Sequence, residues 1–98
     1  MATLLGQTVG RYHVEGELGS GGMGEVFLGV HPTIGSRVAI KVLNADSARD
    51  EDVCERFFTE ARAVNTIRHD NIVQVLDLDR LPDGRPYIVM EYLEGLSL

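Results

Sequence analysis

The sequence predicts an α+β domain in which a five-stranded, mainly antiparallel sheet packs against one helix. Two observations predict this fold. Short runs of apolar and β-branched residues, separated by turns rich in glycine and proline, occupy most of the 98 residues, and such runs are typical of strands. One longer stretch, residues 51–67, carries apolar side chains at helical spacing. The resulting order, three strands, a helix and two strands, favours an antiparallel sheet with the helix on one face.

The first three strands are predicted at residues 12–18, 25–30 and 38–43. A glycine-rich bend joins the first two, which therefore form a hairpin. Pro32 and Gly35 mark the turn before the third strand. The third run, VAIKVL, is almost entirely apolar, so we expect both of its faces to be covered.

The helix and the last two strands follow. Residues 44–49 read as a polar connection, and Asp50 is a suitable helix cap because its carboxylate can accept a bond from a free amide in the first turn. The tetrapeptide RHDN ends the helix, and the fourth strand is predicted at residues 72–77. The segment LPDGRP is a strong turn signal. The fifth strand then covers residues 87–90.

Length and composition narrow the classes of protein. We expect one domain over residues 11–98 and an N-terminal extension over residues 1–10. The net charge of −6 disfavours a nucleic-acid surface, since phosphate backbones attract lysine and arginine. No apolar run reaches the ~18–20 residues of a membrane span. The single cysteine, Cys54, excludes an internal disulfide, which fits a reducing cytoplasm.

Residues 19–24, GSGGMG, fit the pattern G-x-G-x-x-G, which by itself is a weak signal for phosphate binding. A dinucleotide-binding fold needs a helix to begin at the third glycine, whereas here EVFLGV follows, which is a strand pattern. The phosphate loop with a G-K-[ST] ending is also absent. A glycine loop between two antiparallel strands instead predicts a flap whose backbone amides close over phosphates.

Lys41 and Glu60 are two charges in apolar surroundings. Lys41 interrupts the apolar run of the third strand, and Glu60 lies between Phe57 and Val64 on the apolar stripe of the helix. A buried charge needs a partner of opposite sign, so the two are predicted to pair across the helix–sheet interface. The alternatives are that Lys41 is exposed on an edge strand and that Glu60 reaches solvent from the edge of the stripe.

Together these motifs resemble the first lobe of protein kinases. The glycine motif with Val26 two residues later, the VAIK run ending at Lys41 and the helix carrying Glu60 follow that family's order. GSGGMGEV is most similar to eukaryotic-like bacterial serine/threonine kinases. HDNIV resembles the family's link from the helix to the fourth strand, and YIVMEYL resembles its fifth strand and hinge.

The resemblance implies a role for each matching residue. Lys41 would bind the α- and β-phosphates of ATP while paired with Glu60. Val26 and Ala39 would cover the adenine, with Leu18 at the lip of the pocket. The loop that covers the phosphates would consist of Gly19, Ser20, Gly21, Gly22, Met23 and Gly24. The gatekeeper would be Met90, and the hinge contacts to adenine would come from Glu91 and Leu93. The packed column of the active state would include Val64 and Val75.

The same resemblance limits what the 98 residues are expected to do. They contain no H-R-D or D-F-G triplet, so the ligands of Mg²⁺ and the catalytic aspartate are expected in a second lobe, and no metal site is expected here. We expect the chain alone to be inactive, and a kinase joined to its second lobe to phosphorylate protein substrates. The alternatives are a non-catalytic nucleotide-binding or regulatory module, with self-association through this lobe, and the less favoured dinucleotide oxidoreductase.

Overall fold

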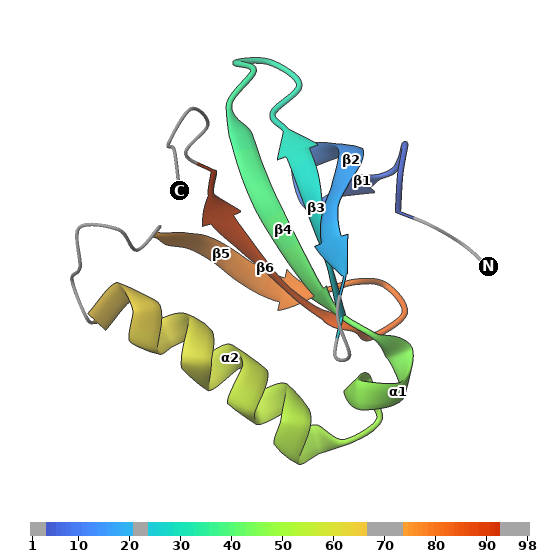
Figure 1. Cartoon of the computed structure of the whole chain (residues 1–98), viewed down its shortest axis with the longest axis vertical. Helices are drawn as coiled ribbons and strands as arrows, with labels where there is room; N and C mark the ends of the chain where they lie inside the picture. Colours follow the sequence, from blue (N-terminus) through green and yellow to red (C-terminus); the bar gives the residue numbers. More distant parts are fainter. Residues whose placement is uncertain (1–3, 21–23, 67–73, 93–98) are drawn as a thin grey trace.

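The computed structural model describes residues 4–20, 24–66 and 74–92, except that the side chains of residues 63–66 are not described. Six antiparallel strands form one sheet in the order β1-β2-β3-β4-β6-β5. A long helix, α2, lies along one face of the sheet and contacts β5 and β6 (Figure 1). The elements are β1 Thr8–Val9, β2 Tyr12–Ser20, β3 Gly24–Val30, β4 Arg37–Leu43, α1 Ala45–Ala48, α2 Glu51–Thr66, β5 Val75–Arg80 and β6 Pro86–Glu91.

The α+β class is confirmed, but the predicted count of five strands is wrong, because the described residues form six. The additional strand, β1, pairs with the start of β2 through Val9 and Tyr12. Gly10 makes the reversal possible with a φ of 59°, a conformation that glycine adopts without steric penalty. A strand of two residues is too short to show an alternating pattern. Leu4 and Val9 are buried in the same core as β2 to β4, while the domain boundary after residue 10 stays a prediction.

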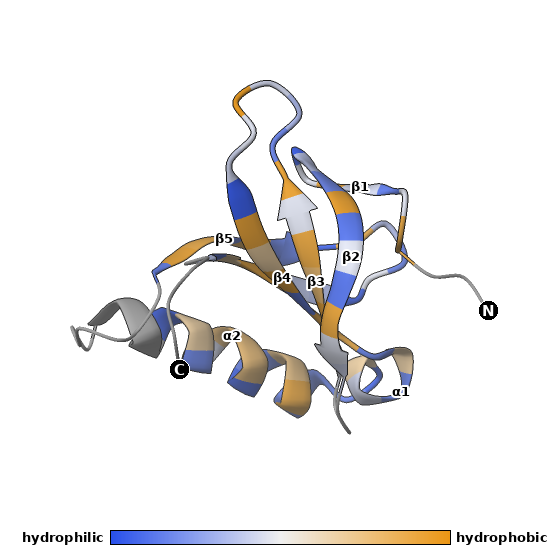
Figure 2. Ribbon diagram, turned by 45° about the horizontal axis from the view of Figure 1, so that its top comes forward, coloured by the Kyte–Doolittle hydropathy of each residue, from blue (hydrophilic) through white to orange (hydrophobic). Residues whose placement is uncertain are grey.

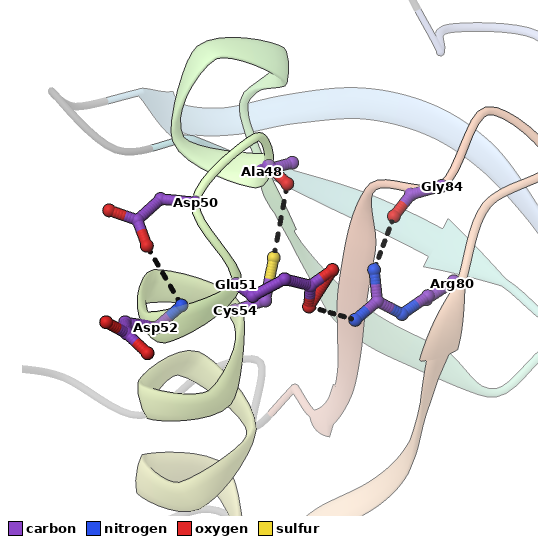
Figure 3. A network of polar contacts seen from close by, with 7 residues as sticks. All are labelled: Ala48, Asp50, Glu51, Asp52, Cys54, Arg80 and Gly84. Carbon is purple, nitrogen blue, oxygen red and sulfur yellow. Dashed lines mark hydrogen bonds and ion pairs between the residues drawn. The ribbon is translucent and has the colours of Figure 1, made fainter.

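The connection before α2 also differs from the prediction. Residues 45–48 form the short helix α1, whose first turn is capped because the Asn44 side chain accepts a hydrogen bond from the Ser47 amide at 2.8 Å. The predicted cap of α2 is confirmed: the Asp50 carboxylate accepts from the Asp52 amide at 2.9 Å (Figure 3). Cys54, buried in the next turn, donates its thiol to the Ala48 carbonyl at 3.4 Å and thereby links the two helices.

The fourth predicted strand is displaced along the sequence. It was expected at residues 72–77 and is observed as β5, Val75–Arg80, with residues 72 and 73 outside the described part. The segment LDLDR continues the strand because β5 is an edge strand, where charged side chains on the open face remain in water. The predicted turn is observed at residues 81–85, and β6 begins at Pro86, one residue earlier than the fifth strand was expected.

Alternation along β4 divides the core into two clusters. Val38, Ile40 and Val42 point into a cluster on the face away from α2, whereas Leu43 joins a second cluster beneath α2. Apolar residues follow one another along β3 and β4 (Figure 2). Lys41 belongs to the same face as Leu43, since residues two apart in a strand share a face. This alternation places the lysine on the helix side of the sheet.

Candidate functional site

Lys41 stands in the middle of the sheet, on its helix side. In the strand register it lies opposite Val26 of β3 and Ile88 of β6. A hollow of about 210 Å³ opens beside it between β4 and α2, and Glu60 of α2 lines the same hollow. A second hollow, of about 180 Å³, is also lined by Lys41 and Glu60. The structure therefore brings together the two charges that the sequence singled out.

The expected burial of these two charges is wrong. Both side chains are exposed, and among the ion pairs of the described residues none joins Lys41 to Glu60. The apolar stripe of α2 is centred on Cys54, Phe57 and Ala61, all of them buried, so Glu60 lies at its edge. Both charges keep their hydration, which explains why neither requires a partner in this conformation.

The ammonium group of Lys41 instead lies over an aromatic ring. Its Nζ is 5.8 Å from the centroid of the Phe57 ring. Phe57 also contacts Phe58 edge-on, with the ring centroids 6.0 Å apart. Sequence periodicity placed Phe57 on the helix stripe, but its contact with Lys41 was not anticipated.

An apolar patch continues from Lys41 along the same face of the sheet. Ala39, two residues before Lys41, lies opposite Leu28 on one side and Met90 on the other. Ala39 is buried, while Val26, Leu28 and Met90 are half-buried. Leu18, at the end of β2, is 43% exposed. The patch could cover a flat apolar ring next to the lysine.

The glycine-rich segment connects β2 to β3 at the edge of the hollow. Gly19 and Ser20 end β2 and Gly24 begins β3, while Gly21, Gly22 and Met23 lie outside the described residues. A Cβ at Gly24 would collide with the carbonyl oxygen of Val42, whereas one at Gly19 would meet no atom within 4 Å. Close strand packing therefore already requires a glycine at position 24, independently of any ligand.

The residues predicted to form the hinge and the packed column are described only in part. Glu91, exposed at the end of β6, donates its backbone amide to the Gln74 carbonyl at 2.9 Å. Val75 is buried in the cluster beneath α2. Leu93 and the side chain of Val64 lie outside the described part of the chain.

The hollow holds more positive than negative charge. Lys41 and Arg56 line it together with Glu60, and Lys41 is the only lysine in the sequence, the other eight cations being arginines. Arg56 was missed by sequence reasoning, although it precedes Glu60 by four residues and so lies on the same helix face. Two cations and one anion suit an anionic ligand.

Arg80 anchors the first half of α2 to the sheet (Figure 3). Its Nη1 donates to the Gly84 carbonyl at 3.0 Å in the β5–β6 turn, and its Nη2 lies 3.6 Å from the Glu51 carboxylate at the start of α2. The guanidinium also lies 5.7 Å from the centroid of the Phe58 ring. These contacts tie the start of the helix to the turn that β5 and β6 share.

Two features are absent from the described residues, a helix that could span a membrane and a cluster of side chains that could hold a metal ion. None of their helices has both the length and the apolar character that crossing a membrane requires. Nor do they bring together three or more histidine, cysteine, aspartate or glutamate side chains in an arrangement that could hold a metal ion.

Comparison with known proteins gives consistent matches. The protein kinase domain family matches residues 12–98. Serine/threonine-protein kinase Pkn1 of Myxococcus xanthus is 50% identical over 95 residues, and the match covers 97% of this chain and 14% of that protein. Serine/threonine-protein kinase PrkC of Bacillus subtilis is 41% identical over 96 residues, with 97% and 15% covered.

Solved structures agree with these sequence matches. A double mutant of the PknI kinase domain of Mycobacterium tuberculosis superimposes with a TM-score of 0.77 at 35% identity, covering 98% of this chain and 38% of that one. The chain thus spans about a seventh of the length of Pkn1 and PrkC and about two fifths of the PknI kinase domain.

Proposed function

The chain belongs to the protein kinase family, and on this premise we propose that it forms the ATP-binding lobe of a serine/threonine kinase. One observation carries the proposal. The only lysine of the chain and Glu60 line one hollow, directly beside an apolar patch on the same face of the sheet. A cation next to an apolar patch matches a triphosphate joined to a flat purine.

The proposed roles follow from position. Lys41 binds the α- and β-phosphates and pairs with Glu60, as protein kinases require of this lysine and glutamate. Val26 and Ala39 cover the adenine, and Leu18 lies at the lip of that pocket. The other contacts come from the backbone amides of residues 20–24, from the gatekeeper Met90, and from the carbonyl of Glu91 with the amide of Leu93.

The proposed role requires Lys41 and Glu60 to come together as an ion pair. In protein kinases the lysine–glutamate pair must be formed for activity, and the position of the helix controls it. Here both residues line the same two hollows without forming an ion pair. Pairing therefore requires movement of these two side chains or of α2.

Phosphoryl transfer is proposed for the complete protein. The family's second lobe supplies the catalytic aspartate and the ligands of Mg²⁺, and the 98 residues contain neither an H-R-D nor a D-F-G triplet. Joined to such a lobe, the chain would present ATP to serine or threonine hydroxyls of protein substrates. We place this activity in the cytoplasm, where ATP is available.

The test replaces the lysine. Lys41→Met keeps most of the apolar stem and removes the charge, and because Lys41 is exposed the fold should tolerate it. We expect Mg-ATP affinity, measured with a fluorescent analogue, to fall at least tenfold, and the complete protein to lose phosphate transfer. Arg37→Met, on the same strand but outside both hollows, serves as the control.

Two outcomes would count against the proposal. Unchanged nucleotide affinity in Lys41→Met would refute the role of this lysine. Nucleotide binding by a complete protein that transfers no phosphate would instead favour the non-catalytic module.

A further inference from the structure

The Phe57 ring is a second possible interaction partner for the Lys41 ammonium group, besides the Glu60 carboxylate. The Lys41 Nζ lies 5.8 Å from the centroid of the Phe57 ring, within the ~6 Å at which a cation is attracted to the face of an aromatic ring. Phe57 lines both hollows that Lys41 and Glu60 share. The lysine therefore has an aromatic and an anionic neighbour in the same space.

The ring is held firmly in place. Phe57 is buried in the cluster beneath α2 and touches Phe58 edge-on. Phe58 in turn lies under the guanidinium of Arg80, which is tied to the β5–β6 turn. The aromatic surface offered to Lys41 is thus fixed by the core, while the lysine itself is exposed and can rotate.

We propose that Phe57 is a positioning residue for Lys41, and that its ring competes with Glu60 for the ammonium group. Phe57 and Glu60 are three residues apart on α2 and so are neighbours on the helix surface. Lys41 can exchange one for the other by rotating its side chain. The consequence for ATP binding rests on the proposed function, whereas the competition itself does not.

The two contacts have comparable strength, which makes the competition effective. Lys41 is exposed, and an exposed cation over an aromatic ring and an exposed ion pair each contribute little and in similar amounts. Neither therefore holds the amine permanently. Removing the ring should raise the ratio of the Glu60-paired form to the remaining forms roughly two- to fivefold. Nucleotide affinity, which needs the paired form, should rise by no more than the same factor.

The unique lysine allows a direct test. A chain labelled with ¹³C- and ¹⁵N-lysine gives one lysine side-chain signal, since Lys41 is the only lysine. Protons over the face of a ring resonate upfield, so the ε protons of Lys41 should be shifted upfield and show nuclear Overhauser contacts to the Phe57 ring. Phe57→Leu should abolish the shift, and Phe58→Leu, its neighbour on the helix, should leave most of it in place.

Glu60→Gln gives the sharper readout. If the carboxylate competes with the ring, neutralising it should leave Lys41 on Phe57 for longer and increase the upfield shift. A Phe57 that served only the core would give no such increase. This arm and the contacts in the unaltered chain remain informative even if Phe57→Leu does not fold.

The affinity for Mg-ATP is measured in a separate experiment. Phe57→Leu should bind Mg-ATP up to about fivefold more tightly than Phe58→Leu. Lys41 ε protons at their unshifted position in the unaltered chain, or an unchanged signal in Glu60→Gln, would overturn the inference. Failure of the unaltered chain to bind Mg-ATP would instead overturn the proposed function and leave the lysine spectra as they are.

Discussion

Replacing Glu60 should have almost no effect on the stability of the nucleotide-free chain. The sequence pattern by itself suggested a buried ion pair, and breaking such a pair costs about 3–5 kcal/mol because one charge stays buried alone. The structure gives a different expectation. Glu60 and Lys41 are both exposed, so removing the carboxylate leaves no buried unpaired charge.

The magnitude follows from that exposure. Surface substitutions away from special contacts change the free energy of unfolding by no more than about 0.5 kcal/mol, and this is the bound we expect for Glu60→Gln. Glu60→Ala should fall within the same range, because alanine forms helix slightly better than glutamate. Urea unfolding followed by circular dichroism measures both variants. Glu55→Gln is the matched control, since it is exposed on α2 and lines neither hollow.

The effect of Glu60→Gln on stability should become measurable when Mg-ATP is present. At a concentration 100 times Kd, a ligand that binds only the folded state stabilises it by about 2.7 kcal/mol. If Glu60→Gln weakens nucleotide binding tenfold, about 1.4 kcal/mol of that gain is lost, while Glu55→Gln keeps it all. A loss above about 2 kcal/mol without nucleotide, in Glu60→Gln alone, would refute the reasoning.

Three further predictions concern the scaffold. Gly24→Ala should lower the free energy of unfolding in urea by about 1–3 kcal/mol, because the new methyl group meets the Val42 carbonyl. Gly19→Ala, which has open space around the new methyl group, should lower it by less than about 1 kcal/mol. Equal losses in the two variants would contradict this prediction. Arg80→Gln should speed amide hydrogen exchange in the first turns of α2, because Arg80 links the start of the helix to the Gly84 carbonyl. The coupling energy between Arg80 and Glu51, measured in a double-mutant cycle, should stay below about 1 kcal/mol. Unchanged exchange would show that Arg80 does not anchor the helix. Burial raises the pKa of Tyr87 above its ordinary 10.0, and the charges of Asp79 and Asp77 add to this shift. The stability that Tyr87 contributes is therefore complete below pH 10 and is lost as the pH rises through the raised value. Urea unfolding between pH 9 and 11 should show a fall in the free energy of unfolding that Tyr87→Phe reduces and Tyr12→Phe does not.

Much of the fold could be predicted because local chemistry determines it. The run VAIKVL became β4, and Asp50 caps α2 as expected. β1 was missed because its two residues carry no periodic signal, and it exists because Gly10 turns the chain and Val9 fills the core. β5 was misplaced because charged residues at an edge strand resemble a loop in sequence.

The site was predicted in its members but not in its contacts. Periodicity placed Glu60 on the helix side facing Lys41, and both line one hollow. It could not give the centre of the apolar stripe, because Glu60 and Ala61 are adjacent in sequence and a rotation of 100° decides which is buried. The contact of Lys41 with Phe57 depends on the distance between helix and sheet, which no local pattern contains.

An ion pair between Lys41 and Glu60 requires movement of the helix or of the two side chains, and not of the sheet. β4 is paired along its length with β3 on one side and β6 on the other, so the backbone at Lys41 cannot move without breaking both ladders. Polar contacts hold the first turns of α2, and the buried side chains of Phe57 and Ala61 pack on the sheet on either side of Glu60. Glu60 itself is exposed at the edge of this contact, so its side chain can rotate. With the strand fixed on both sides, the rotamers of Lys41 and Glu60 and the distance of α2 from the sheet therefore set whether the lysine meets the ring or the carboxylate.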